Sequence, residues 1–103
     1  MKKPVRFTHL AHLDLEAVVE YYFALSPKTA SKYYHAIISA AARLRAFPEI
    51  GRIVPEFEEE YVEKYRELIC DNYRIIYRID VNDIFIIRII DSRRLLTLDI
   101  IGR

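Results

Sequence analysis

Residues 61–94 contain three runs of β-branched and aromatic residues separated by two short polar breaks. The breaks are Asp71-Asn72 and Asn82-Asp83, which are residue types that favour tight turns. Apolar runs of this length with such breaks predict an antiparallel meander of three strands. No other stretch of the chain limits the possible folds as strongly, because it fixes a sheet whose strands follow one another in sequence.

Successive side chains of a strand point to opposite faces of the sheet, and this alternation sorts the runs. In the second run one face carries Tyr73, Ile75, Tyr77 and Ile79, and the other carries Arg74, Ile76, Arg78 and Asp80. In the third run Ile84, Ile86, Arg88 and Ile90 alternate with Phe85, Ile87, Ile89 and Asp91. We therefore expect one apolar face that is covered and one mixed face that carries arginines and stays wet.

Two helical patterns precede the sheet and supply the expected cover. The first begins near Thr8 or His9, and three- and four-residue steps predict one apolar stripe of Leu10, Leu13, Ala17, Tyr21 and Leu25. Ser26 and Pro27 suit the N-cap and first position of a second helix that runs to about Phe47. Its regular apolar positions are Ala30, Tyr34, Ile37, Ala41 and Leu44. Because only Ser26 and Pro27 separate the two helical patterns, the helices are predicted to form an antiparallel hairpin.

The remaining segments complete the expected order. Pro4 to His9 is a candidate opening strand, Phe47 to Pro55 a loop, and Glu56 to Glu60 a solvated acidic segment. The tail after Arg94 is expected to form a last strand or a packed segment. Strands and helices are thus segregated, which predicts a single α+β domain over residues 1–103, with a strand, a helix hairpin and three or four antiparallel strands.

Bulk properties exclude several classes of protein. The net charge is +1 in 103 residues, and a single cysteine, Cys70, rules out an internal disulfide. The apolar runs are too short to span a bilayer, and the opening MKKPVRF lacks the apolar core of a signal peptide. We therefore expect a cytoplasmic protein without membrane contact.

Six arginines are candidates for function because a strand rarely carries arginine where valine would serve. They are Arg66, Arg74, Arg78, Arg88, Arg93 and Arg94. Clustered guanidinium groups make phosphate and macromolecule sites, but arginines on a sheet also form local ion pairs on a solvated surface. The sequence leaves both interpretations open. His9 and His12 have helical metal-ligand spacing but no acidic or sulfur partners that cluster with them, so no metal or cofactor is expected.

The order of these segments and several short sequence motifs within them resemble the ParE/RelE family of toxins from type II toxin–antitoxin modules. The resemblance covers nearly the whole chain. It rests on Ala11, Asp14 and Leu15, on Tyr21-Tyr22, on the loop FPEIGR, on Tyr65-Arg66-Glu67-Leu68 and on the segment YRIIYR from Tyr73 to Arg78. The P-x-x-G-R loop and the Y-R-E-L strand are more similar to the ParE branch than to the RelE branch.

The resemblance implies a toxin that is held inactive by a cognate antitoxin wrapped around the helix hairpin and sheet. The antitoxin-binding residues would be Leu10, Leu13, Tyr21, Tyr34, Ile37 and Leu44, and the two proteins would form a hetero-oligomer. ParE-like members poison DNA gyrase, whereas RelE-like members cut mRNA in the ribosomal A site. The six arginines would bind the target in either case.

Cleavage of RNA requires an acid or base as well as cations. A RelE-like nuclease would place Arg66, Arg74, Arg93 and Arg94 at the scissile phosphate. However, no tyrosine follows Tyr77, no histidine follows His35, and Leu68 stands where a second basic residue is expected. Arginine alone is a poor proton donor and acceptor at neutral pH. The sequence thus favours gyrase inhibition, with a ribosome-dependent endoribonuclease or a non-toxic antitoxin-binding partner as alternatives.

Overall fold

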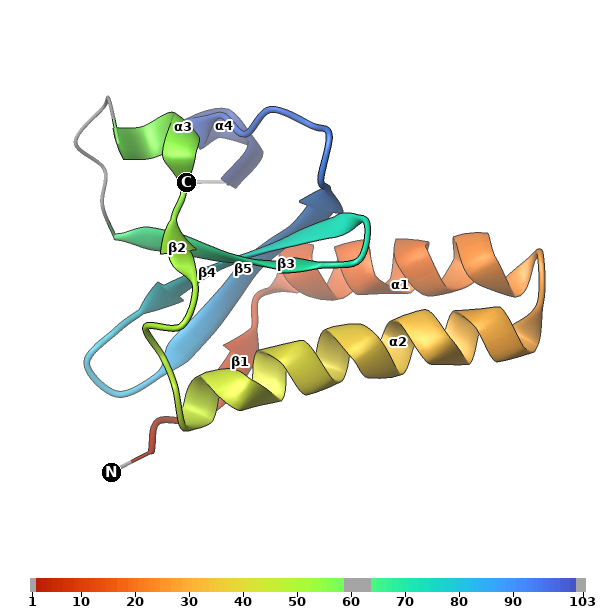
Figure 1. Ribbon diagram of the computed structural model, residues 1–103, viewed down its shortest axis with the longest axis horizontal. Helices are drawn as coiled ribbons and strands as arrows, with labels where there is room; N and C mark the ends of the chain where they lie inside the picture. Colours follow the sequence, from red (N-terminus) through yellow and green to blue (C-terminus); the bar gives the residue numbers. More distant parts are fainter. Residues whose placement is uncertain (1, 59–63, 102–103) are drawn as a thin grey trace.

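The computed structural model describes residues 2–58 and 64–101 (Figure 1). In order, its elements are β1 (Val5–Phe7), α1 (His9–Phe23), α2 (Pro27–Ala42), a 3-10 turn η1 (Arg43–Arg45), β2 (Arg52–Ile53), α3 (Pro55–Glu58), β3 (Tyr65–Cys70), β4 (Tyr73–Ile79), β5 (Ile84–Asp91) and α4 (Leu98–Ile101). The α+β prediction is confirmed. The start of the first predicted run, Tyr61 to Glu63, and the last two residues of the acidic segment, residues 59–60, lie outside the described residues.

The sheet has five strands in the order β1-β5-β4-β3-β2. Strands β3, β4 and β5 form the predicted antiparallel meander, and Asp71 adopts the left-handed conformation in the first turn with φ 51°. Strand β1 joins the sheet beside β5 in parallel orientation, with Val5 opposite Ile84. The loop predicted from Phe47 to Pro55 contains the short strand β2, which pairs with β3 and so extends the sheet by one strand.

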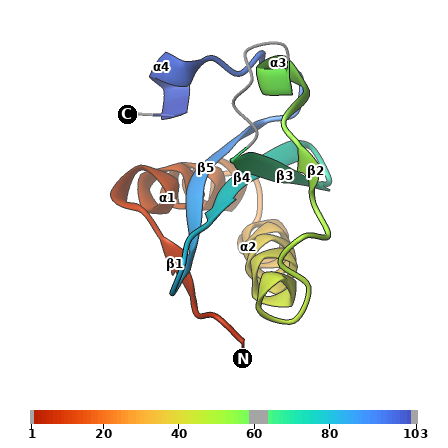
Figure 2. The ribbon, with the colours of Figure 1, turned by 90° about the vertical axis from the view of Figure 1, so that its left-hand side faces the viewer.

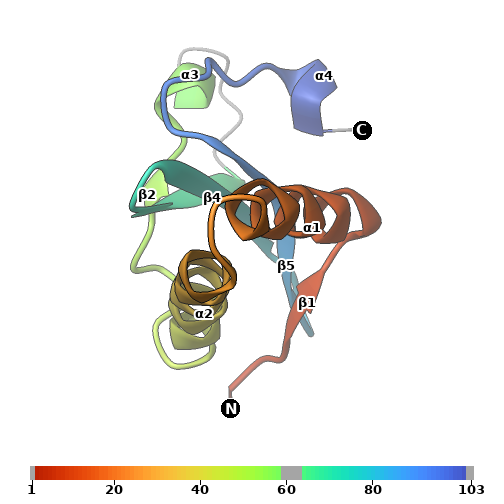
Figure 3. The same ribbon diagram turned by 90° about the vertical axis from the view of Figure 1, so that its right-hand side faces the viewer.

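The helix hairpin forms as its capping residues predict. The Thr8 hydroxyl accepts a hydrogen bond from the backbone N–H of Ala11 at 3.2 Å, and the Ser26 hydroxyl accepts one from Thr29 at 3.4 Å. Helix α1 packs on β5 and α2 on β3. Both helices therefore lie on one side of the sheet (Figure 3). Helix α2 stops at Ala42, and η1 completes the segment that was predicted to remain helical up to Phe47.

The face of α1 that points inward differs from the prediction. Ala11, Leu15 and Val18 are buried, whereas all five residues of the predicted stripe are exposed. Helix α1 carries apolar side chains on more than one flank, so spacing alone does not decide which flank meets the sheet. The prediction that Leu10 and Leu13 belong to the core is wrong, and their flank remains as an apolar surface.

The sheet has a core on each face. Beneath the helix hairpin lie Ala11, Leu15, Val18, Ile37, Ala41, Leu44, Ile75, Tyr77, Ile84, Ile86 and Ile89. The other face packs Val54, Phe57, Tyr65, Ile76, Ile87, Ile90, Leu96 and Ile101. The segments that carry α3 and α4 lie across the sheet from the hairpin (Figures 1 and 2). The expectation of a wet second face is thus wrong, and the packed tail ends in a helix instead of a strand.

A β-bulge in β5 explains why simple alternation fails there. Tyr77 pairs with Ile86 and Ile76 pairs with Arg88, so Ile87 is an additional residue on β5. Beyond the bulge the pattern is shifted by one. As a result Ile89 joins the core under the hairpin, and Ile90 joins the core on the other face.

Candidate functional site

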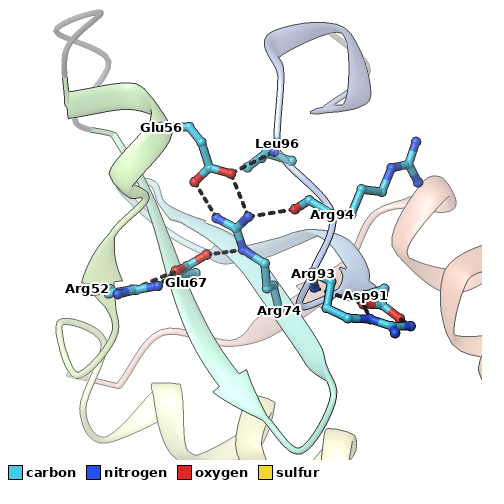
Figure 4. A network of polar contacts seen from close by, with 8 residues as sticks. All are labelled: Arg52, Glu56, Glu67, Arg74, Asp91, Arg93, Arg94 and Leu96. Carbon is cyan, nitrogen blue, oxygen red and sulfur yellow. Dashed lines mark hydrogen bonds and ion pairs between the residues drawn. The ribbon is translucent and has the colours of Figure 1, made fainter.

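Arg74 is the centre of a buried ion-pair network (Figure 4). It lies on β4, and only 5% of its surface is exposed. Its Nε donates to Glu67 Oε1 at 2.6 Å, while its Nη1 and Nη2 donate to the two Glu56 oxygens at 2.6 and 2.7 Å. Nη1 also donates to the backbone carbonyl of Arg94 at 3.0 Å. Every nitrogen of this guanidinium group therefore has an acceptor within the chain.

The two glutamates extend the network to five segments of the chain. Glu56 also accepts from the backbone N–H of Leu96 at 2.7 Å, and Glu67 accepts from Arg52 Nε at 2.7 Å. The hydrogen bonds from Arg74 lower the pKa of Glu56 to about 2, and the same bonds raise the pKa of Arg74. The network joins β2, α3, β3, β4 and the segment after β5. Glu56 is therefore a structural residue, although the sequence predicted a solvated one.

Three further arginines are each paired with a nearby carboxylate. The pairs are Arg78 with Asp80 at 2.9 Å, Arg88 with Asp14 at 2.7 Å and Arg93 with Asp91 at 3.0 Å. Arg88 also donates to the backbone carbonyl of Ile100, which ties β5 to α4. The side chain of Arg94 extends away from the network, and it has no carboxylate partner in residues 2–58 and 64–101.

Arg66 lies on the other face of the sheet, where it stabilises the P-x-x-G-R loop. It is paired with Tyr77 across β3 and β4, and its Nη1 donates to the Gly51 carbonyl at 2.9 Å. The buried hydroxyl of Tyr77 accepts from the Gly51 N–H at 2.9 Å and donates to the Pro48 carbonyl at 2.7 Å. A Cβ on Gly51 would lie 2.6 Å from the Tyr77 hydroxyl, so the close approach requires glycine.

The six arginines therefore do not form the single exposed face that the sequence predicts. Arg74 is buried, Arg66 belongs to the opposite face, and Arg88 reaches α1 at the edge of β5. The physical reason is that the second face is covered by α3, α4 and the segment between β5 and α4, which bring carboxylates and carbonyls to the arginines. Target binding by these residues stays a prediction.

The hollow nearest the predicted nuclease residues has a volume of about 460 Å³. Its lining consists of Arg52, Pro55, Glu56, Ile69, Arg74, Ser92, Arg93, Arg94 and Leu95. Arg66 is not among these residues, so the structure brings together only three of the four arginines proposed for RNA cleavage. Arg52 was missed, although it stands in the FPEIGR loop. Glu56 is the only carboxylate in the lining, and Arg74 already binds it.

The predicted antitoxin-binding residues divide into two groups. Leu10, Leu13, Tyr21 and Tyr34 are exposed, but Ile37 and Leu44 are buried in the core under the hairpin. Those two assignments are wrong, because the apolar stripe of α2 faces the sheet. Next to Tyr34, a hollow of about 450 Å³ opens between α1 and α2, and it is lined mainly by apolar side chains with Glu16 and Glu20 among them.

A tyrosine cluster joins both helices to β4. The rings of Tyr22 and Tyr33 are stacked with centroids 3.9 Å apart, and Tyr73 meets Tyr33 edge-on at 6.3 Å. Burial raises the pKa of Tyr73, so its hydroxyl stays protonated at neutral pH. This cluster fastens the helix hairpin to the sheet.

His12 Nε2 lies 3.2 Å from Glu16 Oε1, but residues 2–58 and 64–101 contain no group of three potential metal ligands. Within the same residues, no helix combines the length and the apolar character needed to cross a membrane.

Comparisons with known proteins connect this geometry to one family. A family model described as the ParE toxin of the type II toxin–antitoxin system parDE matches residues 5–96. The chain is similar to a structure of the chromosomal ParDE system from P. aeruginosa, with TM-score 0.72, 24% identity, and coverage of 87% of this chain and 96% of that chain. It is also similar to the RelBE2 toxin–antitoxin complex from Mycobacterium tuberculosis, with TM-score 0.63, 22% identity, and coverage of 88% and 92% respectively. The comparison with curated proteins gave no match.

Proposed function

The chain belongs to the ParE toxin family of type II toxin–antitoxin systems, and we propose that it acts by binding DNA gyrase instead of by cleaving RNA. The observation that carries this proposal is the state of Arg74. A catalytic guanidinium must be free to receive the charge that develops on a phosphate in the transition state. Arg74 is buried, and four of its five N–H groups already donate to two carboxylates and one carbonyl, so its charge is engaged within the fold.

The protonation chemistry supports the same conclusion. RNA cleavage needs a group that gives or takes a proton near neutral pH. The hollow beside Arg74 is lined by four arginines and one glutamate, and the pKa of that glutamate is held at about 2. The described part of this hollow therefore offers cations for binding but no acid or base for catalysis.

Ribosome-dependent RNA cleavage remains the second candidate function because this hollow does collect Arg52, Arg93 and Arg94 near one another. Binding of an RNA phosphate there would require Arg93 to leave Asp91, to which it donates from Nε and Nη2 at 3.1 and 3.0 Å. This pair is exposed and therefore weak. Of the six candidate arginines, Arg93 and Arg94 are accordingly the two that we assign to target contact in either function.

The partner that neutralises the toxin is a cognate antitoxin, and we place it on the exposed flank of α1. Leu13 is 45% and Tyr21 65% exposed, and with Leu10 they follow one line along the helix. An apolar line of this kind on a small protein marks a surface that another protein covers. The expected assembly is a hetero-oligomer of toxin and antitoxin in the cytoplasm.

The proposal is tested with relaxed plasmid, purified gyrase and ATP, to which the purified toxin is added with and without its antitoxin. We expect the toxin to stop supercoiling and to cause cleaved DNA complexes to accumulate, and the antitoxin to restore supercoiling. An exposed charge reversal, Arg94→Glu, should weaken inhibition. Unchanged supercoiling at a large excess of folded wild-type toxin would contradict the proposal.

A further inference from the structure

The P-x-x-G-R loop presents apolar side chains in fixed positions. Phe47 is 62% and Ile50 45% exposed, and together with Pro48 and Glu49 they line a hollow of about 340 Å³ whose walls are almost entirely apolar. The backbone behind them is fixed by the buried hydroxyl of Tyr77, as described above. The fold gains little from exposed side chains, whereas a preorganised apolar group lowers the entropy cost of binding a partner.

The charges beside this loop are mainly positive. Arg43 and Arg45 belong to η1, directly before the loop, and both are exposed. Neither forms an ion pair with any residue in the described ranges 2–58 and 64–101. Most arginines of the sheet are paired with carboxylates. Arg43 and Arg45 are instead cations available for a partner.

We propose that Phe47, Ile50, Arg43 and Arg45 form a docking site for the toxin's protein target. The site would take a segment in which an apolar side chain stands next to a carboxylate. This inference rests on the proposed function, in that it assumes a protein target. The apolar walls of the hollow favour such a segment over nucleic acid, because a phosphate backbone has no apolar side chain to fill them.

The loop and the surface assigned to the antitoxin are formed by different elements, and no residue of α1 lines the hollow at the loop. The loop follows the C-terminal end of α2, whereas the α1–α2 connection beyond Tyr21 lies at the opposite end of the long axis of the molecule (Figure 1). Two separate surfaces allow changes at the loop to affect the target without affecting the antitoxin.

Three variants test the site in the full-length toxin. Phe47→Ser with Ile50→Ser removes the apolar contacts, and Arg43→Glu with Arg45→Glu reverses the charge. Tyr77→Phe keeps every contact residue but removes the hydroxyl that fixes the loop. Val81→Ser is the matched control, because Val81 is 86% exposed in the β4–β5 turn and does not line the hollow at the loop.

The readouts are growth arrest on induction, the toxin concentration that halves gyrase supercoiling, and affinity for the antitoxin. We expect the two double variants to lose growth arrest and to need at least tenfold more toxin to inhibit gyrase, with antitoxin affinity within twofold of wild type. Tyr77→Phe should give an intermediate loss, and Val81→Ser none. The retained antitoxin affinity shows that the variants are folded.

Each other outcome has a distinct meaning. Double variants that arrest growth as wild type does would overturn the docking site while leaving the proposed function intact. Loss of antitoxin affinity with toxicity retained would assign the loop to the antitoxin and overturn the inference. Binding of a fluorescent single-stranded oligonucleotide that Arg43→Glu with Arg45→Glu abolishes would also overturn it. A wild type that arrests growth without inhibiting gyrase, with harmless loop variants, would retain the docking site and reject gyrase.

Discussion

The variant Arg74→Met tests whether Arg74 stabilises the fold or binds the target. The change removes four hydrogen bonds and leaves the fully buried Glu67 carboxylate with Arg52 alone. Removal of one partner of a buried ion pair typically costs about 3–5 kcal/mol. In a domain of this size about 1 kcal/mol moves the thermal midpoint by roughly 4–8 °C, so we expect a fall of at least about 12 °C.

The double variant Arg74→Met with Glu67→Leu separates the two roles. It replaces both buried charges by apolar side chains, a change that is often neutral or stabilising. The Glu56 side chain is 21% exposed, so it regains water and keeps its bond from the Leu96 N–H. We therefore expect the double variant to unfold within about 2 kcal/mol of the wild type. Its toxicity should equal that of the wild type.

The assays are thermal unfolding followed by circular dichroism and growth arrest on induction below both midpoints. A single variant as stable as the wild type would show that the network does not stabilise the fold. A double variant that is stable but harmless would show that Arg74 contacts the target, and the structural interpretation of this residue would be refuted.

The pKa of Glu56 is about 2 when folded against an ordinary value of 4.5, so its share of the stability, up to about 3 kcal/mol, is present above pH 4.5 and is lost as the pH falls toward 2. Urea unfolding between pH 2 and 7 should show this loss for wild type and a flatter profile for Glu56→Gln, and equal slopes would contradict it. Gly51→Ala should lower the free energy of unfolding by about 1–3 kcal/mol because its Cβ would meet the Tyr77 hydroxyl at 2.6 Å, and an unchanged urea midpoint would refute that reason. Leu13→Asp should weaken antitoxin binding at least tenfold in calorimetry, which is about 1.4 kcal/mol, without changing toxin stability. Unchanged affinity would show that the antitoxin does not bind this flank of α1.

Local signals predicted much of the fold. The polar breaks, the Thr8 and Ser26 caps and the short helix connection each act over a few residues, and the structure contains the elements they indicate. Long-range features could not be predicted in this way. The bulge at Ile87 depends on how two strands pair, and the flank of α1 that is buried depends on where the sheet lies.

The candidate site shows the same division. Strand alternation correctly placed Arg74 and Arg78 on one face. It gave no indication that α3 and the tail cover that face and bring Glu56 onto Arg74 from 18 residues away. The FPEIGR loop stands out as a sequence motif. The requirement for its glycine comes from a long-range contact, because the Gly51 N–H donates to the buried hydroxyl of Tyr77.

The central claim is that the toxin acts by binding gyrase and not by cutting RNA. The most direct test measures both effects in one culture after induction, with plasmid topology read on chloroquine gels and mRNA ends mapped by primer extension. The account predicts relaxed plasmid and broken chromosomal DNA, with mRNA ends identical to those of uninduced cells. Codon-phased mRNA cuts that appear while plasmids remain fully supercoiled would contradict it.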